Sequence, residues 1–540
     1  MLPAPCAATE AIILLAVSYR GRVARAAAIV MAGYVVSKAV ALLRDRIIAQ
    51  TFGTGASLDA YYAAFNLPDL LFTLIAGGAL ATAFIPVLAD YLALDEAGQE
   101  RAWQLSSNVL TVILLATAAF AAVVALVAGP LMAHLIAPGF TPEQAALSAA
   151  LMRVILISTV IFSASGTLMG VLNARQHFFS PAFAPMFYNV GIIVGARVFA
   201  RHFPPDRAVY GLAWGVVFGA ALHLLSHTPA LIHHQARLRP RLDLRDPGLQ
   251  QVLRLMGPRV LALGVIKVNL LVQGNLASRL DEGSLSALTF AWGLMQLPET
   301  IFATAIATAV FPTLAELAGR HELVALRRTM MEMLRAILAL TIPAAVGLIV
   351  LGRPLIALMF QGGAFGSRST DAVFFALEFY AFGLIAHSLL EVVARTFYAQ
   401  KDTRTPLYVA AGAMVLNVGL AVTLLGPLRH GGLALANSLA VAAEVLVGLW
   451  LLRGRLHGLE MRATLRTIAQ VVVAAAFMGV AVWGWTAWQS DANVLIVGIG
   501  GAVIGAATYV VVGLALGVEE LRLVPALLLR RRRASIPVEG

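Results

Sequence analysis

Long apolar stretches alternate with short polar connections along most of the chain. A helix that crosses a lipid bilayer needs about 20 largely apolar residues, and about fourteen stretches meet that requirement. Several are longer than the minimum, which indicates tilted helices or helices that extend beyond the bilayer. The predicted spans cover residues 26–50, 60–90, 104–135, 146–173, 182–202, 209–233, 252–279, 285–315, 330–360, 371–399, 405–427, 431–453, 463–488 and 492–517.

The polar connections divide these spans into groups. The longest connection, residues 234–250, separates six spans from eight, an arrangement typical of transporters with two lobes. We therefore predict an all-α polytopic membrane protein with two six-helix lobes and two C-terminal helices. The predicted parts are an extension (1–21), a first lobe (22–235), a basic cytoplasmic loop (236–250), a second lobe (251–456), two further helices (457–520) and a basic tail (521–540).

Composition supports lipid as the surrounding solvent. Hydrophobic residues make up 60% of the 540 residues and charged residues 12%, against about 45–50% and about 25% in soluble domains. The net charge is +11, but the arginines lie between the apolar stretches, as topology signals do, so we expect no nucleic-acid partner. One cysteine, Cys6, excludes a disulfide framework or a cysteine-based metal cluster.

Alternate connections differ in positive charge. One set contains most of the arginines, including Arg101, Arg175 and those of the loop 234–250, whereas the other set contains few beyond Arg207 and Arg368. Lysine and arginine accumulate on the cytoplasmic side of membrane proteins. The pattern predicts a multi-pass inner-membrane protein with both termini in the cytoplasm.

Several charges fall within the first two predicted spans. Lys38 and Arg44 lie in the first span and Asp59 opens the second. A charge at membrane depth costs about 2.5–3.5 kcal/mol on insertion scales, so such residues usually face a cavity or each other. These three residues either line a cavity or pair with neighbouring charges at the membrane interface.

Other polar residues of the spans have two interpretations each. Lys267, within VIKVNLLV, either joins a buried ion pair or contributes to a cavity, and Arg353 is a further candidate. His387 and Glu391 are four residues apart, a spacing that places both on one helix face, for a proton relay or a structural hydrogen bond. His223 and His227 have the same spacing but no third ligand nearby, so we predict no metal site and no cofactor.

Long runs of the chain resemble the MurJ/MviN family of lipid II flippases. The first is SKAVALLRDRIIAQTFGTGASLDAYYAAFNLPDLLF (37–72), and similar runs cover residues 170–195, 256–280, 285–317 and 394–420. The resemblance extends over about residues 22–460, and the last two helices match by number and position. It implies a member of the multidrug/oligosaccharidyl-lipid/polysaccharide exporter superfamily, with two six-helix lobes around a cationic cavity that flips a pyrophosphate-linked lipid by alternating access.

The resemblance also assigns roles by position. Arg44 matches an essential cavity arginine, Asp59 matches a functional acid, and Lys38 stands where the family usually has another arginine. Lysine keeps the charge but loses the two-pronged geometry that arginine offers to phosphate. We expect Arg44 and Asp59 to face a water-filled cleft between the lobes.

At several other positions the chain departs from the family. Phe72 and Thr73 replace two consecutive arginines, Gly77 replaces a glutamate, and Gly293 replaces another arginine. Asn417 matches one ligand of the sodium site that some members have, but Ala421 stands where an acid is expected. An anionic headgroup needs compensating charge once it is desolvated. Lys267 and Arg353 are the second-lobe candidates for that compensation.

Three functional hypotheses remain open. The first is a flippase for lipid II, the undecaprenyl-pyrophosphate-linked peptidoglycan precursor. The second is an exporter of another lipid-linked glycan or amphiphile, and the third is a degenerate paralogue that acts as a structural partner in cell-wall synthesis. The sequence contains no Walker loop and no G-x-S-x-G elbow, so we predict a transporter, not an enzyme. Expected partners are the polyprenyl-pyrophosphate lipid, membrane lipids and cell-wall synthesis proteins, with the chain itself a monomer.

Overall fold

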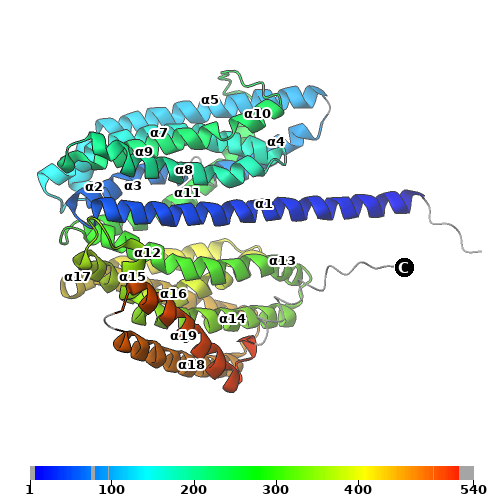
Figure 1. Ribbon diagram of the computed structural model, residues 1–540. Helices are drawn as coiled ribbons and strands as arrows, with labels where there is room; N and C mark the ends of the chain where they lie inside the picture. Colours follow the sequence, from blue (N-terminus) through cyan, green and yellow to red (C-terminus); the bar gives the residue numbers. More distant parts are fainter. Residues whose placement is uncertain (1–6, 74–78, 95, 490–491, 522–540) are drawn as a thin grey trace, which may run out of the picture. The chain divides into compact units, whose positions relative to one another are not determined.

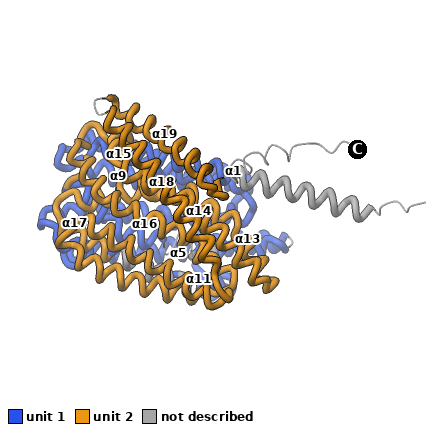
Figure 2. Tube along the Cα trace, turned by 90° about the horizontal axis from the view of Figure 1, so that it is seen from below, with its two compact units in different colours: residues 1–52, 56–271 blue, residues 53–55, 272–540 orange. Residues whose placement is uncertain are grey.

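The computed structural model describes residues 7–73, 79–94, 96–489 and 492–521, and these residues are almost entirely helical (Figure 1). Two compact units divide the chain, one formed by Met1–Phe52 and Ala56–Leu271 and the other by Gly53–Gly55 and Val272–Gly540 (Figure 2). The division falls inside one long helix, and not in the connection 236–250. The predicted domain bounds therefore stay a prediction.

The described residues of the first unit form eleven α-helices, the last of which continues into the second unit. They are α1 (Ala7–Phe52), α2 (Ala56–Ala64), α3 (Asn66–Leu71), α4 (Ala79–Leu92), α5 (Glu96–Leu126), α6 (Ala128–Leu131), α7 (Pro142–Ala174), α8 (Phe179–Arg197), α9 (Val209–Leu225), α10 (Thr228–His233) and α11 (Pro247–Ala277). Short π and 3₁₀ turns occupy Met132–Ile136, Phe199–His202 and Pro205–Arg207.

Eight more α-helices follow in the part of the second unit that the structure describes. They are α12 (Ser284–Pro298), α13 (Ala305–Gly319), α14 (Leu323–Val350), α15 (Gly352–Phe360), α16 (Ser367–Ala399), α17 (Arg404–Arg455), α18 (Met461–Trp488) and α19 (Val494–Ala515). A π-helical segment, Glu299–Thr304, follows Pro298 and joins α12 to α13. The single span predicted over 285–315 is thus interrupted, directly after a proline that cannot donate a backbone hydrogen bond.

Ten helices of the described residues are long and apolar enough to cross a membrane. One of them, α17, contains two of the predicted spans, because it bends back at Arg429, where φ is 46°. Pro427 lies just before the bend and disfavours a continuous helix. The all-helical membrane fold is confirmed, and the number fourteen stays a prediction.

Small residues allow α8 and α9 to pack closely. Gly191 and Gly195 of α8 face Gly219 and Gly215 of α9, and a Cβ atom at any of these positions would overlap the opposite helix backbone. This is the small-xxx-small pattern by which membrane helices approach one another. The α8–α9 pair in turn supports the polar residues of the first unit.

The basic connection between the predicted lobes lies along α5 and is not a free linker. Asn108 of α5 forms two hydrogen bonds with the backbone of Asp243, from Nδ2 to the carbonyl oxygen (2.7 Å) and from the Asp243 N–H to Oδ1 (2.9 Å). The N–H groups of Arg239 and Arg241 donate to the hydroxyls of Ser107, the residue before Asn108, and Thr111, three residues after it. Polar residues on one face of α5 therefore satisfy the backbone of an extended segment.

The two C-terminal helices pack on α14 within the second unit. Tyr509 of α19 donates to the carbonyl oxygen of Ala339 at 2.5 Å, and Arg335 pairs with Glu520 at 3.3 Å. Buried apolar residues of α14, α18 and α19 surround these contacts. The helices are thus attached to the second unit, while their opposite faces expose large apolar residues such as Trp483 and Val503.

Candidate phosphate-binding site in the first unit

Arg44 lies on α1 where this helix packs against α8. Its Nε and Nη2 atoms both donate to Oδ1 of Asp45, at 2.9 and 2.7 Å. The two side chains are 25% and 29% exposed, so the ion pair is partly withdrawn from solvent. This contact neutralises Arg44 within α1 itself and fixes one edge of the guanidinium group.

A second contact comes from α8. Arg44 Nη1 donates to Oδ1 of Asn189 at 2.7 Å, and the Asn189 amide nitrogen donates to the carbonyl oxygen of Pro185 at 3.0 Å. The second hydrogen bond orients the buried amide so that its oxygen faces the arginine. Sequence reasoning missed Asn189, although a lone amide in the apolar run MFYNVGIIV could have identified it.

The three hydrogen bonds leave part of the guanidinium group available. Arginine has five N–H donors, and the contacts within the described part of the chain use three of them. The remaining N–H groups belong to Nη1 and Nη2, the two nitrogens that bind a phosphate in the two-pronged arrangement. Arg44 is therefore oriented without being saturated, as an anion-binding arginine must be.

Tyrosines and Asp59 complete the surroundings. Tyr62 of α2 lies close enough to interact electrostatically with Arg44, Asp45 and Asp59, and Tyr188 of α8 does so with Arg44. Asp59 is 3% exposed. The structure therefore places Asp59 and Arg44 around one tyrosine of the same unit.

Contacts with α7 hold α2 in place. Ser148 donates to the Ala60 carbonyl oxygen at 2.7 Å, and Gln144 donates to that of Ala56 at 3.0 Å. These two bonds fix the first turn of α2, which carries Asp59.

The other three predicted site residues are not brought into this cluster by any described contact. Lys38 is partly exposed on α1, and it has no ion pair among the described residues. Arg353 lies at the start of α15, where it is 63% exposed, pairs with Asp371 at 3.4 Å and stacks over Phe374. Lys267 belongs to α11, and its side chain lies outside the described residues.

The positions that lack family arginines differ in what surrounds them. Phe72 packs edge-on against Phe162, with ring centroids 5.0 Å apart, and Phe162 packs against Tyr188 at 4.9 Å. Gly293 of α12 has open space where a side chain would begin. Thr73 is partly buried, and Gly77 lies outside the described residues. Aromatic packing thus replaces positive charge at position 72, and the space beside position 293 is open.

His223, His227 and His387 each have a hydrogen-bond partner within their own unit. His223 hydrogen-bonds with Ser165 (2.6 Å) and His227 with Ser180 (2.8 Å), and the described residues contain no group of three potential metal ligands. His387 bonds with Asn437 at 3.0 Å, while Glu391 pairs with Arg395. Asn417 and Ala421 are both buried in α17.

Comparison with known proteins decides the family. The sequence model described as "Lipid II flippase MurJ" matches residues 48–517. The chain belongs to this family. Its members are transporters and not enzymes, and the ten apolar helices identify the chain as a multi-pass membrane protein.

Curated MurJ relatives match over most of their length. A lipid II flippase MurJ of Burkholderia cenocepacia is 32% identical over 448 residues, which cover 81% of this chain and 85% of the relative. A probable lipid II flippase MurJ of Rhizobium meliloti is 31% identical and covers 84% of both chains. One from Vibrio cholerae is 29% identical over 92% of this chain and 97% of its own.

Solved structures give the same fold. A lipid II flippase MurJ in an inward closed conformation aligns with a TM-score of 0.75 at 24% identity, covering 89% of this chain and 97% of that one. An inward-facing multidrug resistance transporter of the MATE family, from the MOP superfamily, aligns with a TM-score of 0.65 at 16% identity, over 78% and 94%. The MurJ-like fold predicted from the sequence is therefore confirmed.

Proposed function

We propose that the chain is a lipid II flippase that moves its substrate across the inner membrane by alternating access. The observation that carries the proposal is the family match over residues 48–517, and Arg44 supplies the matching chemistry. An arginine fixed by Asp45 and Asn189 keeps N–H donors for a phosphate oxygen. A pyrophosphate that leaves water needs such donors, because an uncompensated charge is costly at membrane depth.

Each candidate residue has a proposed role. Arg44 binds the pyrophosphate, Lys38 adds a second positive charge on the same helix, and Asp59 interacts with Tyr62 beside Arg44. Lys267 of α11 and Arg353 of the second unit are the candidates for the positive charge that is missing at positions 72, 73 and 293. The proposal includes a water-filled cleft between the lobes, both termini in the cytoplasm and a monomer that works beside cell-wall synthesis proteins.

Complementation tests the proposal most directly. A strain depleted of its own lipid II flippase should grow when it expresses this chain, and should fail with Arg44→Ala at equal protein level. Arg46→Ala is the matched control, because Arg46 lies two residues further on α1 and is exposed. Growth supported equally by the wild type and Arg44→Ala would refute the role of Arg44, and no growth with either would refute the function.

The second-lobe candidates need a separate test. Arg353 is mostly exposed and already paired with Asp371, so Arg353→Ala distinguishes a substrate contact from a surface ion pair. If Arg353 binds substrate, Arg353→Ala loses complementation while Asp371→Ala retains it. If only Lys267→Ala loses complementation, the compensating positive charge belongs to α11.

One observation favours a second function. Phe72 extends an aromatic series through Phe162 to Tyr188 beside Arg44, where the family usually has an arginine. Such a wall suits an amphiphile with less negative charge than a pyrophosphate. Export of another lipid-linked glycan or amphiphile is therefore the alternative, and it predicts lipid binding without complementation. The structural-partner hypothesis predicts neither lipid binding nor complementation.

A further inference from the structure

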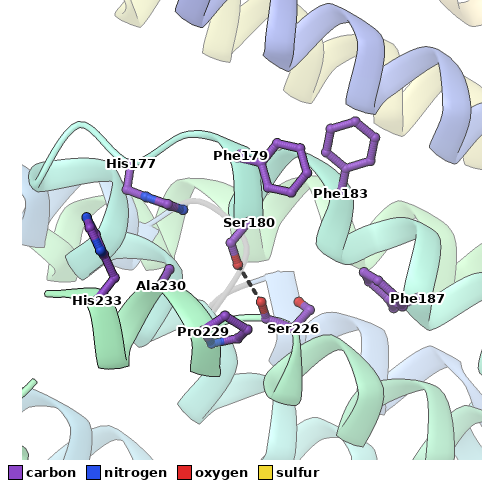
Figure 3. Close-up of a pocket in the computed structure, with 9 residues that line it drawn as sticks. All are labelled: His177, Phe179, Ser180, Phe183, Phe187, Ser226, Pro229, Ala230 and His233. Carbon is purple, nitrogen blue, oxygen red and sulfur yellow. Dashed lines mark hydrogen bonds between the residues drawn. The ribbon is translucent and has the colours of Figure 1, made fainter.

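A pocket of about 380 Å³ lies in the first unit, between the start of α8 and α10 (Figure 3). Its volume is within the range of small-molecule sites, about 300–1,000 Å³. The pocket does not belong to the Arg44 site. The lining residues are His177, Phe179, Ser180, Phe183, Phe187, Ser226, Pro229, Ala230 and His233.

The wall formed by α8 is a row of phenylalanines. Phe179, Phe183 and Phe187 are spaced by four residues and therefore share one helix face. Phe179 and Phe183 are in ring contact, with centroids 4.8 Å apart. Pro229 and Ala230 of α10 add further apolar surface. This wall suits a hydrocarbon chain.

The serine hydroxyls of the pocket already form hydrogen bonds within the protein. Ser180 donates to the carbonyl oxygen of Ser226 at 2.8 Å and also bonds with His227. The Ser226 hydroxyl donates to the carbonyl oxygen of His223. Because both hydroxyls already have partners, the interior of the pocket is apolar in its chemistry.

One end of the pocket differs, because imidazoles gather there. Figure 3 shows His177 and His233 at the end opposite Phe187. The ring of His234 contacts both, with centroids 5.6 Å from that of His177 and 5.2 Å from that of His233. Arg175, two residues before His177, lies over Trp103 and donates to Gln99.

This cluster of Arg175, His177, His233 and His234 lacks negative charge. Within the described residues no carboxylate pairs with any of the four, and Nε of Arg175 and Nε2 of His234 are buried without a hydrogen-bond partner. Burial, followed by the neighbouring His233, lowers the pKa of His177, and burial lowers the pKa of Arg175. An anion placed here would satisfy buried donors and reverse these shifts.

We propose that this pocket binds an anionic phospholipid of the surrounding leaflet, with one acyl chain along Phe179, Phe183 and Phe187 and the phosphate against the cluster. Basic pockets between membrane helices on the cytoplasmic side commonly bind lipid headgroups. One arginine and three weakly basic imidazoles suit the single charge of a phosphodiester better than a pyrophosphate. The site is thus a lipid site separate from the proposed substrate site.

Lipid retention on the purified full-length chain tests the proposal. The chain is placed in nanodiscs that contain phosphatidylglycerol and phosphatidylcholine with identical acyl chains, and the lipid it retains is measured by native mass spectrometry. We expect phosphatidylglycerol to be retained at least tenfold over phosphatidylcholine. Arg175→Gln combined with His177→Gln should abolish the preference, because the two changes remove the cationic groups of the cluster and leave the phenylalanine wall in place.

A second variant examines the acyl chain. Ala230→Trp fills the pocket and should lower phosphatidylglycerol retention at least tenfold, whereas Leu225→Trp, at an exposed position outside the pocket, should not. If Ala230→Trp fails to fold, Phe183→Ala removes the middle of the wall instead. Equal retention of the two lipids, or retention insensitive to both kinds of variant, would overturn the proposal. So would lipid II that displaces phosphatidylglycerol, since the pocket would then be a substrate site.

Discussion

Arg44 and Asn189 are 145 residues apart in the sequence, yet the guanidinium group donates to the amide oxygen at 2.7 Å. The amide is fixed by its own hydrogen bond to Pro185, so Asn189 orients Arg44 from a second helix. A hydrogen bond to a charged group contributes about 1.5–3 kcal/mol. Asn189 is therefore a positioning residue for the proposed phosphate contact.

Two substitutions of Asn189 should weaken lipid II binding to different extents. Asn189→Asp places a second carboxylate beside Arg44, so we expect lipid II affinity to fall by about tenfold or more. Asn189→Ala loses the orienting bond but adds no charge, and should have a smaller effect. Binding to purified protein measures both, with thermal stability as the control. Equal losses for the two variants would contradict a role through the charge of Arg44.

Restoring a family arginine should strengthen binding. A side chain at Gly293 begins in open space, so Gly293→Arg is tolerated sterically. We expect it to increase lipid II affinity by one charge-assisted hydrogen bond, about 1.5–3 kcal/mol. Native mass spectrometry of wild type and variant with lipid II provides the measurement, and Gly293→Gln is the uncharged control. Tight wild-type binding that Gly293→Arg leaves unchanged would show that another cation, with Lys267 first, already compensates the pyrophosphate.

The helices and their membrane character could be predicted from the sequence because each depends on local apolar composition. Even the hairpin hidden within α17 was predicted, since Gly426-Pro427 marks the break. The interruption at Glu299–Thr304 was not predicted, because Pro298 is also compatible with an unbroken kinked helix. Local pattern thus predicts where helices exist better than where they deform.

The candidate site was predictable only in part. Arg44 and Asp59 stand out as charges in apolar runs, whereas Asn189 acquires its meaning from the approach of α8 to α1. Similarly, the contacts of Asn108 with Asp243 depend on how the basic connection lies on α5. Such tertiary partners are set by packing, which a single sequence does not reveal.

Close packing of α8 and α9 makes their glycines sensitive. Gly215→Leu would place a side chain into the backbone of Gly195, and overpacking of this kind typically costs about 1–3 kcal/mol. We expect a lower melting temperature for the purified protein in detergent. Gly419→Leu is the control, because Gly419 lies in a helix with open space around it. A melting temperature unchanged by Gly215→Leu would contradict the α8–α9 packing.

Asp402 should make stability depend on pH. It accepts two hydrogen bonds from Thr405 and forms an ion pair with Arg455, with an N–O distance of 2.7 Å. Asp402 thereby joins the two ends of the α17 hairpin. The hydrogen bonds from Thr405 hold the pKa of the Asp402 carboxyl well below its usual value. Because the pKa of this carboxyl is lower in the folded state than in the unfolded state, its contacts stabilise the folded protein at pH values above the unfolded pKa, about 3.9. This stabilisation is lost as the pH falls from that value through the pKa of the folded state.

Asp402→Ala should therefore lower the melting temperature at pH 7, by loss of the hydrogen bonds that Asp402 accepts at the start of α17, about 1 kcal/mol. The difference from the wild type should shrink below a pH of about 4, because there the Asp402 carboxyl takes up a proton in the unfolded wild-type chain but stays ionised in the folded one. Melting curves of both proteins between pH 7 and pH 3 measure this, and Asp371→Ala, at a mostly exposed ion pair, is the control. A difference that stays constant over this range would contradict the argument.

Membrane orientation follows from the distribution of arginine and can be tested with single cysteines. Cys6→Ser gives a cysteine-free chain, in which Pro240→Cys marks the basic connection and Ser367→Cys marks the first residue of α16. Both positions are exposed, whereas the neighbouring Phe365 is buried. If the arginine-rich connections are cytoplasmic, a membrane-impermeant thiol reagent should label position 367 in intact cells, and position 240 only after the cells are opened. Labelling of position 240 from outside would reverse the orientation, and with it the leaflet from which the proposed flippase takes its substrate.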